Sequence, residues 1–371
     1  MSLGHPAASA MLDEVARSLP KVLAGRQLAF IGDSVSQYLF DDLSDRLTAT
    51  LHTKPTVVPF VGFINATYHQ HCHQWKSPVS IFQLCFASAA RKDPASTRPA
   101  GSLRVQRTSN GDLLPGACDK VVDSFEEYSI GDSMECLLAR GSLAKESVAI
   151  VNFGLHHNEE SSLRDQANGF VQWLSSARRA AAASNGPSLP CLLWMQSLPQ
   201  HFPTPDGTYR RNWLFDEKCN TNSANSSALT LATIGDGSGC APLPRGLPSG
   251  SQQRFNDMTD GIIADVGLPA IGAWRLAAEH WDEHSGCICY PTAWINRSAT
   301  AVSKTHCGQM WFKRHVLDCT HFQRPQRRMR VHVTFAHAKV LRATLEAVRQ
   351  HCPSPAAQGP EPPRPSAVKM I

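Results

Sequence analysis

The sequence predicts an α/β protein with three layers, in which a mostly parallel central sheet is covered by helices on both faces. Short, continuous apolar runs, which are typical of strands buried on both faces, recur along the chain. Longer stretches with apolar residues at helical spacing lie between these runs. The 371 residues, of which 42% are hydrophobic and 18% charged, are sufficient for a globular domain with a sizeable core.

The predicted strands are four apolar runs, at residues 28–31, 56–63, 148–153 and 191–195. Helices are expected at residues 11–24, 35–47, 123–140, 161–184 and 331–350. Ligands of such sheets bind beyond the carboxyl ends of the strands. Ser34, Asn152 and the segment after Met195 lie at such ends, so they are the first candidates for a functional site.

One large domain is predicted over residues 26–352, preceded by a lead-in helical segment at residues 1–25. Within it, residues 203–253 are rich in Pro, Gly, Ser and Asn and are expected to form an irregular insertion. Residues 285–310 contain three cysteines and are expected to form a loop held by disulfides. Residues 353–371 are rich in proline, so we expect a disordered tail.

The cysteines indicate an oxidising compartment. The chain has 12 of them, an even number at scattered positions, which favours disulfides over a single metal cluster. Three N-glycosylation sequons, beginning at Asn65, Asn225 and Asn296, point the same way. Residues 1–25 lack the apolar core of a signal peptide, and no stretch has the ~20 apolar residues of a membrane span. We therefore expect a protein of the Golgi lumen or the extracellular space, whose targeting segment or membrane anchor is absent from this chain.

Charge and residue spacing argue against two classes of ligand. The net charge of +5 is small, and the basic cluster at residues 324–330 comes with no recognisable nucleic-acid-binding module, so we expect no nucleic acid partner. An anionic glycan or a solvated surface explains this cluster equally well. Two groups of His and Cys, at residues 69–73 and 287–307, lack the regular spacing of zinc sites. Disulfides account for these cysteines better than a metal does, and we expect neither a metal nor a cofactor.

Ser34 has the local context of a nucleophile, because it follows a predicted buried strand and begins a predicted helix. Such a turn exposes the hydroxyl, and the helix amino terminus offers N–H groups to a developing oxyanion. The alternative is that Gly32-Asp33-Ser34 is only a turn with a helix cap. A second Gly-Asp-Ser copy ends at Ser133 but follows no buried strand, so we expect a turn or cap there.

Two further segments carry side chains suited to acyl transfer. Asn152 ends a predicted strand, and its amide can donate to an oxyanion or, alternatively, bind its own loop. Asp318 and His321 are three residues apart, so on a single turn the carboxylate would orient the imidazole and fix its tautomer. The pair of Asp282 and His284 has the same residue types and is a rival for this role.

These segments resemble, in their order along the chain, those of the PC-esterase or trichome-birefringence-like family of the SGNH (GDSL-type) hydrolase superfamily. The matching segments are Gly32-Asp33-Ser34, Asn152-Phe153-Gly154, Ser197-Leu198-Pro199-Gln200-His201, Asp282-Glu283-His284 and Asp318-Cys319-Thr320-His321. The chain departs from the plant members at Gln37, where they usually carry Arg, and at His156 and His157, which replace an aromatic pair.

The resemblance implies a flavodoxin-like SGNH fold and acyl transfer through an acyl-serine intermediate. It implies Ser34 as the nucleophile, His321 as the general base and Asp318 as the orienting acid. The backbone N–H of Ser34 and the amide of Asn152 would form the oxyanion hole, with Gly62 as a third donor. The implied reaction is O-acetyl transfer to carbohydrate or polysaccharide hydroxyls, from an acyl donor such as an acetyl ester or acetyl-CoA.

Two other functions are compatible with the same scaffold. The first is a carbohydrate or lipid acylesterase, which uses the same residues but passes the acyl group to water. The second is a non-catalytic glycan-binding protein, in which Trp194, Trp213 and Trp274 would stack on sugars. In each case the partner is a carbohydrate or another acylated small molecule.

Overall fold

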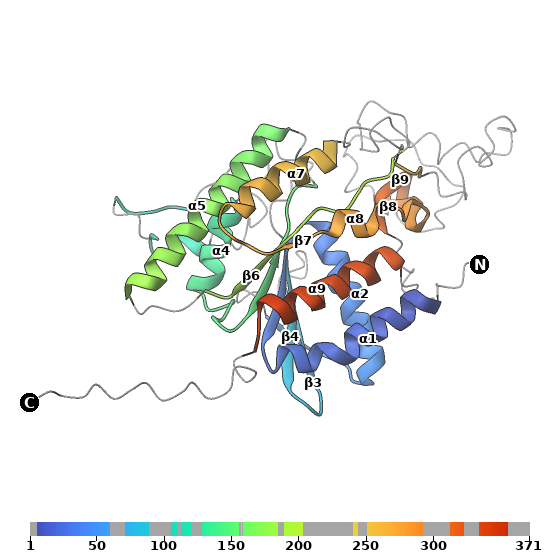
Figure 1. Cartoon of the computed structure of the whole chain (residues 1–371), viewed down its shortest axis with the longest axis horizontal. Helices are drawn as coiled ribbons and strands as arrows, with labels where there is room; N and C mark the ends of the chain where they lie inside the picture. The colour runs from blue at the N-terminus through green and yellow to red at the C-terminus, as the bar shows by residue number, and fades with distance from the viewer. Residues whose placement is uncertain are drawn as a thin grey trace, which may run out of the picture.

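The computed structural model describes residues 6–59, 71–88, 105–109, 113–119, 128–155, 157, 159–184, 189–202, 240–243, 251–291, 312–322 and 334–354. At residues 59, 71, 251–252, 285–291, 312–318 and 321 this description covers the backbone alone. The described parts form an α/β fold with a central sheet of seven strands between two layers of helices, as the sequence predicts (Figure 1).

The central sheet has the strand order β2-β3-β4-β1-β5-β6-β7. Its strands are β1 (Gln27–Gly32), β2 (Thr56–Pro59), β3 (His71–Lys76), β4 (Ile81–Ser88), β5 (Val148–Val151), β6 (Cys191–Met195) and β7 (Ala270–Ile271). Strands β4, β1, β5, β6 and β7 run parallel, whereas β2 and β3 pair antiparallel at one edge. The carboxyl ends of β1, β5 and β6 therefore lie side by side at one edge of the sheet.

Strand β1 supplies both cores, because successive side chains of a strand point to opposite faces. Leu28 and Phe30 pack in one buried cluster with α1 (Pro6–Leu23), α2 (Ser34–Leu51) and α9 (Phe335–His351). Ala29 and Ile31 pack in the other, with α4 (Ile130–Ala139), α5 (Glu160–Ser184) and α7 (Ser251–Ala264). The short helix α8 (Ala273–Ala277) contributes to the first cluster.

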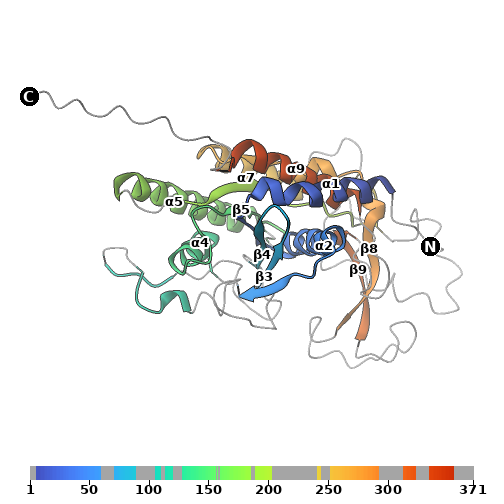
Figure 2. The ribbon, with the colours of Figure 1, turned by 90° about the horizontal axis from the view of Figure 1, so that it is seen from below.

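A separate ribbon of two antiparallel strands, with the turn before it, contains the last two segments that resemble the PC-esterase family, at residues 282–284 and 318–321. It consists of β8 (His284–Pro291) and β9 (Phe312–Phe322), and the 3-10 turn η2 (Trp281–Glu283) leads into it. Figure 2 shows this ribbon at one end of the molecule. Residues 284–291 thus form a strand rather than the loop expected over 285–310, and residues 292–310 lie outside the described part.

Four disulfides join described residues: Cys72–Cys85, Cys118–Cys136, Cys191–Cys352 and Cys240–Cys319. They agree with the predicted oxidising environment, secretory or extracellular. Cys72, one of the residues weighed as a metal ligand, is therefore a disulfide cysteine on β3. Among the described helices, none has the length and hydropathy to cross a membrane.

Several predicted elements need correction. Strand β2 is an antiparallel edge strand, and residues 60–63 of the predicted run lie outside the described part. Helix α4 begins at Ile130, seven residues later than expected, while the residues from 123 to 127 are not described. Helix α7 begins at Ser251, inside the predicted insertion, whose residues 203–239 and 244–250 are not described. Residues 355–371 of the predicted tail are also outside the described part.

Candidate active site

Ser34 is the first residue of α2 and follows the central strand directly, as predicted. The neighbouring Asp33 is buried and caps the helix: its Oδ1 accepts a hydrogen bond from Val35 N at 2.9 Å. Its Oδ2 accepts a second one from Leu155 N, in the loop after β5, at 3.4 Å. The turn is thus fixed from two sides, and Ser34 itself is half-buried.

Gly32 allows the ends of β1 and β5 to approach each other at this turn. A Cβ atom at Gly32 would lie 2.5 Å from the carbonyl oxygen of Asn152 and 2.5 Å from Ser36 Oγ. Real Cβ atoms do not tolerate such distances to backbone, so glycine is required by the space available. The Gly-Asp-Ser turn is therefore a tightly packed junction of two parallel strands and a helix.

Asn152 joins the ends of three neighbouring strands. Its backbone N–H donates to Ile31 O of β1 at 2.9 Å, and its side-chain Nδ2 donates to Met195 O of β6 at 2.9 Å. The same Nδ2 lies 3.5 Å from Ser197 Oγ, and Ser36 Oγ lies 3.5 Å from Oδ1. The amide therefore binds the next strand's end rather than its own loop. Its role in an oxyanion hole stays a prediction.

Helix α7 holds the segment that follows β6. Asn256 makes a pair of hydrogen bonds with the backbone of Ser197: Oδ1 accepts from Ser197 N and Nδ2 donates to Ser197 O, both at 3.0 Å. One turn later, Asp260 accepts from Trp194 Nε1 at 2.9 Å and from Gln196 Nε2. Sequence reasoning missed these two residues, although their spacing of four places them on one face of a helix.

The segment after β6 contacts the end of β9. His201 N donates to Cys319 O at 2.9 Å, and Gln200 Nε2 donates to Thr320 Oγ1 at 3.1 Å. The Cys240–Cys319 disulfide fixes the same point covalently. Two of the segments that match in sequence, 197–201 and 318–321, are thus in direct contact.

Asp318 and His321 lie on strand β9, and their side chains are outside the described part, as is Gly62. The backbone is extended, so the expectation that the two residues share a single turn is wrong. The pairing of β8 and β9 is irregular here, since Gly286 pairs with Asp318 but His284 pairs with Phe322. Residues 319–321 therefore bulge between these pairs. The roles predicted for Asp318 and His321 stay predictions.

His284, the rival base, is buried and has a different partner from the one expected. Its Nε2 lies 2.6 Å from Nδ1 of His201, and its ring stacks on Phe322 with 4.3 Å between the ring centroids. The side chain of Asp282 is exposed. The next residue, Glu283, accepts hydrogen bonds from the first two backbone N–H groups of α9, each at 2.9 Å. The acidic partner of α9 is therefore Glu283, and His284 contacts a second histidine.

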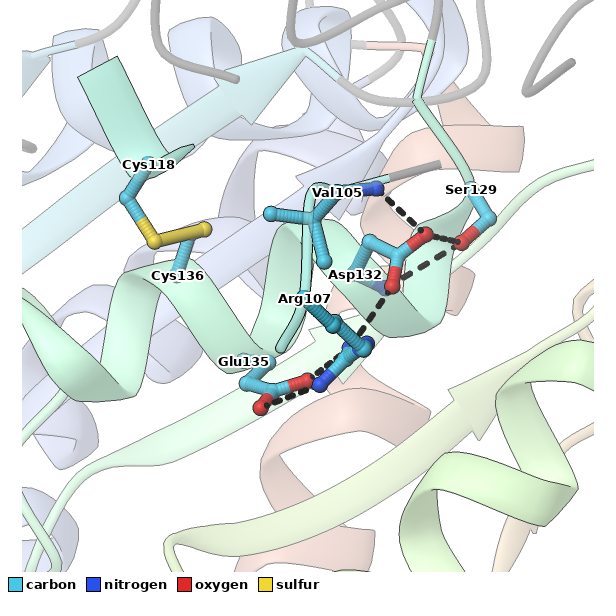
Figure 3. Close-up of polar contacts among 7 residues, drawn as sticks. All are labelled: Val105, Arg107, Cys118, Ser129, Asp132, Glu135 and Cys136. Atoms are coloured by element: carbon cyan, nitrogen blue, oxygen red, sulfur yellow. Dashed lines mark hydrogen bonds and ion pairs between the residues drawn. A yellow bond between two sulfur atoms is a disulfide. The ribbon is translucent and has the colours of Figure 1, made fainter. Parts of the chain in front are cut away.

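The second Gly-Asp-Ser copy lies within the first turn of helix α4, so the predicted turn or cap is wrong in detail, because the N-cap is Ser129. Figure 3 shows Asp132 among its partners: Ser129 caps the helix, and Arg107 donates to Asp132 Oδ1 at 2.9 Å and pairs with Glu135. Ser133 is fully buried. Because a nucleophile must meet its substrate, this burial sets Ser133 apart from Ser34.

Two of the tryptophans considered for sugar stacking do not face solvent. Trp194 is fully buried on β6 and Trp274 is 6% exposed on α8, while Trp213 lies outside the described part. The expectation that Trp194 and Trp274 stack on sugars is therefore wrong in this structure.

His157 is also buried, and its burial lowers its pKa to about 4. His156 is not described.

The carboxyl edge of the sheet thus gathers the segments that contain Ser34, Asn152 and His201, and β9 is attached to the last of these. Among the described residues, no group of three or more His, Cys, Asp or Glu side chains is arranged to hold a metal ion. Comparisons of the chain with models of protein families and with curated proteins find no match.

Proposed function

We propose that the protein is a serine-dependent acyl-transfer enzyme in which Ser34 is the nucleophile. The observation that carries this proposal is the position of Ser34 at the first turn of α2, directly beyond the central strand β1. An 18-residue helix begins there, so its N-terminal N–H groups and its dipole favour negative charge beside the serine. Asp33 holds the backbone of this turn through its hydrogen bonds from Val35 N and Leu155 N.

His321 is proposed as the general base and Asp318 as the acid that orients it. The base takes the proton of the Ser34 hydroxyl while the oxygen attacks an ester carbonyl. Collapse of the tetrahedral intermediate releases the alcohol, which receives that proton, and leaves an acyl-serine. A second hydroxyl, from a sugar or from water, then attacks the acyl group while His321 takes its proton, and this proton passes to the Ser34 oxygen as the acyl bond breaks. The contacts of residues 319 and 320 with Gln200 and His201 support this proposal, because they tie the segment to the sheet edge.

The proposed oxyanion hole consists of the backbone N–H of Ser34, the side-chain amide of Asn152 and Gly62. Asn152 has one firm hydrogen bond, to Met195 O at 2.9 Å, and one long one, to Ser197 Oγ at 3.5 Å. A bond of that length is weak, so we propose that the second N–H of this buried amide exchanges Ser197 Oγ for the oxyanion at small cost.

The proposed substrate is an acetylated donor and a carbohydrate hydroxyl, in the Golgi lumen or outside the cell. The disulfides support an oxidising compartment, secretory or extracellular, and the resemblance of the ordered segments supports a carbohydrate as the acceptor. An esterase that passes the acyl group to water is the alternative. A transferase and an esterase would use the same catalytic residues and would differ in whether the site excludes water. A non-catalytic glycan-binding protein is less favoured, because Trp194 and Trp274 are buried.

A fluorophosphonate probe tests the nucleophile, since it bonds covalently to an activated serine. We expect labelling of the disulfide-bonded protein at Ser34, located by mass spectrometry of the labelled peptide. Ser34→Ala and His321→Ala should abolish it, whereas Ser133→Ala is the matched control and should retain it. A folded protein that is not labelled, or label that is lost in Ser133→Ala alone, would contradict the proposal. Product analysis with an acetyl ester and an oligosaccharide then separates transfer from hydrolysis.

A further inference from the structure

Two buried histidines from distant parts of the chain form a hydrogen-bonded pair next to β9. His201 and His284 are both 0% exposed and 83 residues apart, and Nδ1 of the first lies 2.6 Å from Nε2 of the second. The other ring nitrogen of His201, Nε2, lies 2.9 Å from the carbonyl oxygen of Ala278. These contacts form a chain from a backbone carbonyl to His201 and on to His284.

The carbonyl fixes the direction of this chain. Ala278 O can only accept, so His201 Nε2 must carry the hydrogen. Burial lowers the pKa of His201 to about 4, which keeps the ring neutral near neutral pH. Its Nδ1 then has a lone pair and accepts from Nε2–H of His284. A neutral His284 in this tautomer has its lone pair on Nδ1.

His201 and His284 contact the end of β9 from two sides. On one side, the backbone N–H of His201 donates to Cys319 O at 2.9 Å. On the other, His284 pairs with Phe322 along the ribbon and its ring stacks on the Phe322 ring. The bulge of residues 319–321 begins at the first of these contacts and ends next to the second. The hydrogen bond between the rings therefore links the two contacts that support this bulge.

We propose that His201 is a positioning residue: its Nδ1 holds His284 in the Nε2–H tautomer and thereby fixes the end of β9 that carries the predicted base. The link to catalysis rests on the proposed function, whereas the tautomer does not. Among the described residues, the titratable groups that act on His201 electrostatically are His280 and Asp282. Beyond Phe322, His337 pairs with Asp42.

Two substitutions at position 201 separate positioning from the mere loss of a buried hydrogen bond. His201→Asn keeps an acceptor oxygen in the place of Nδ1 but loses the donor to Ala278. His201→Gln keeps a donor near the place of Nε2 but loses the acceptor for His284. Each variant removes one of two buried bonds, so similar losses of stability are expected, and only the second variant releases His284.

The first measurement is the tautomer of each ring, read from nitrogen–proton correlation spectra of histidine-labelled, disulfide-bonded protein near neutral pH. His284→Gln and the two His201 variants assign the signals by their loss. We expect both rings in the Nε2–H form in the parent protein. His284 should keep this form in His201→Asn and become a mixture of tautomers in His201→Gln. An Nδ1–H form of His284 in the parent protein overturns the proposal.

The second measurement is the rate at which the fluorophosphonate labels Ser34. His201→Asn should be labelled within about threefold of the parent rate, and His201→Gln at least roughly tenfold more slowly, because a displaced base loses its alignment. Equal rates in the two variants, at equal thermal stability, overturn the positioning role. A parent protein that is not labelled contradicts the proposed function instead, and the tautomers still decide this inference.

Discussion

Asp42 of α2 and His337 of α9 face each other in the core, with 2.5 Å between Oδ2 of the carboxylate and Nδ1 of the imidazole. Both side chains are buried, at 4% and 1% exposure. The contact ties the helix that begins at Ser34 to the last helix of the fold. Phe322, at the end of β9, lies edge-on to the same imidazole with 5.4 Å between ring centroids. This pair therefore joins the helix that begins at Ser34, the last helix and the ribbon.

Replacing one residue of the Asp42–His337 pair should lower the free energy of unfolding more than replacing both. His337→Ala leaves the buried Asp42 carboxylate without that hydrogen bond, and we expect a loss of about 1–3 kcal/mol in the free energy of unfolding. The double variant Asp42→Leu, His337→Leu should lose less, because no polar group is left unsatisfied. Denaturant titrations of both variants check this. A double variant that is less stable than His337→Ala would contradict it.

Gly32→Ala should destabilise the protein, because the added methyl would lie 2.5 Å from the backbone oxygen of Asn152. We expect a cost of about 1–3 kcal/mol together with loss of Ser34 labelling. Gly261 on α7 is the matched control, since a Cβ there meets nothing within 4 Å. Gly261→Ala should be stabilising by about 0.5–1 kcal/mol, as is usual within helices. Equal thermal shifts in the two variants would argue against the close packing of the turn.

Asn256→Ala should loosen the segment after β6, because it removes both hydrogen bonds to the backbone of Ser197. The buried N–H of Ser197 would be left unpaired, which costs about 1–3 kcal/mol. We also expect slower labelling of Ser34, since Asn152 contacts this segment. Asp257 is exposed on the same turn of α7, and Asp257→Ala should change stability by no more than about 0.5 kcal/mol. Thermal unfolding and labelling rates of the two variants provide the comparison.

Acid should destabilise the fold through two buried histidines. Burial lowers the pKa of His157 and of His201 to about 4, against an ordinary value of 6.5. Between these values the unfolded chain binds more protons than the folded protein, so the free energy of unfolding falls as pH decreases from about 6.5 to about 4. Each histidine contributes a slope of up to about 1.4 kcal/mol per pH unit in this window.

His157→Gln isolates one of these contributions. Glutamine does not titrate, so we expect a shallower dependence of unfolding free energy on pH in the variant than in the parent protein. Denaturant titrations at several pH values within the window provide the slopes. Parallel curves for the two proteins would contradict the burial of a neutral imidazole at position 157.

The layers of the fold were predictable because β1, β5 and β6 are buried on both faces and so consist of apolar residues. Strand β3 escaped prediction, since its residues His71–Lys76 are mostly polar and only Cys72 and Trp75 are buried among its described side chains. Strand β7 has two residues, which is too short for any periodic pattern. The extended conformation of Asp318–His321 depends on pairing with β8, a contact between distant segments that local spacing does not encode.

The same difference between local patterns and distant contacts applies to the candidate site. The turn at Ser34 is local, so a strand followed by Gly-Asp-Ser and a helical pattern was sufficient to predict it. The partners of Asn152 and His284 lie 43 and 83 residues away, on Met195 and His201. The first contact follows from the order of strands in the sheet and the second from the contact of the separate ribbon with the segment after β6, and the geometry of both required the structure.

The bond between Cys191 and Cys352 has a consequence for how the chain matures. Its two cysteines are 161 residues apart, at the start of β6 and at the end of α9. During synthesis, Cys191 emerges long before its partner, while Cys219 and Cys240 follow it much sooner. Correct pairing therefore waits for α9 to pack beside α1 and β6, so the last helix selects the partner. Retention of a free or mispaired Cys191 is then a marker of unfinished chains, and an oxidoreductase that reshuffles disulfides should speed their maturation.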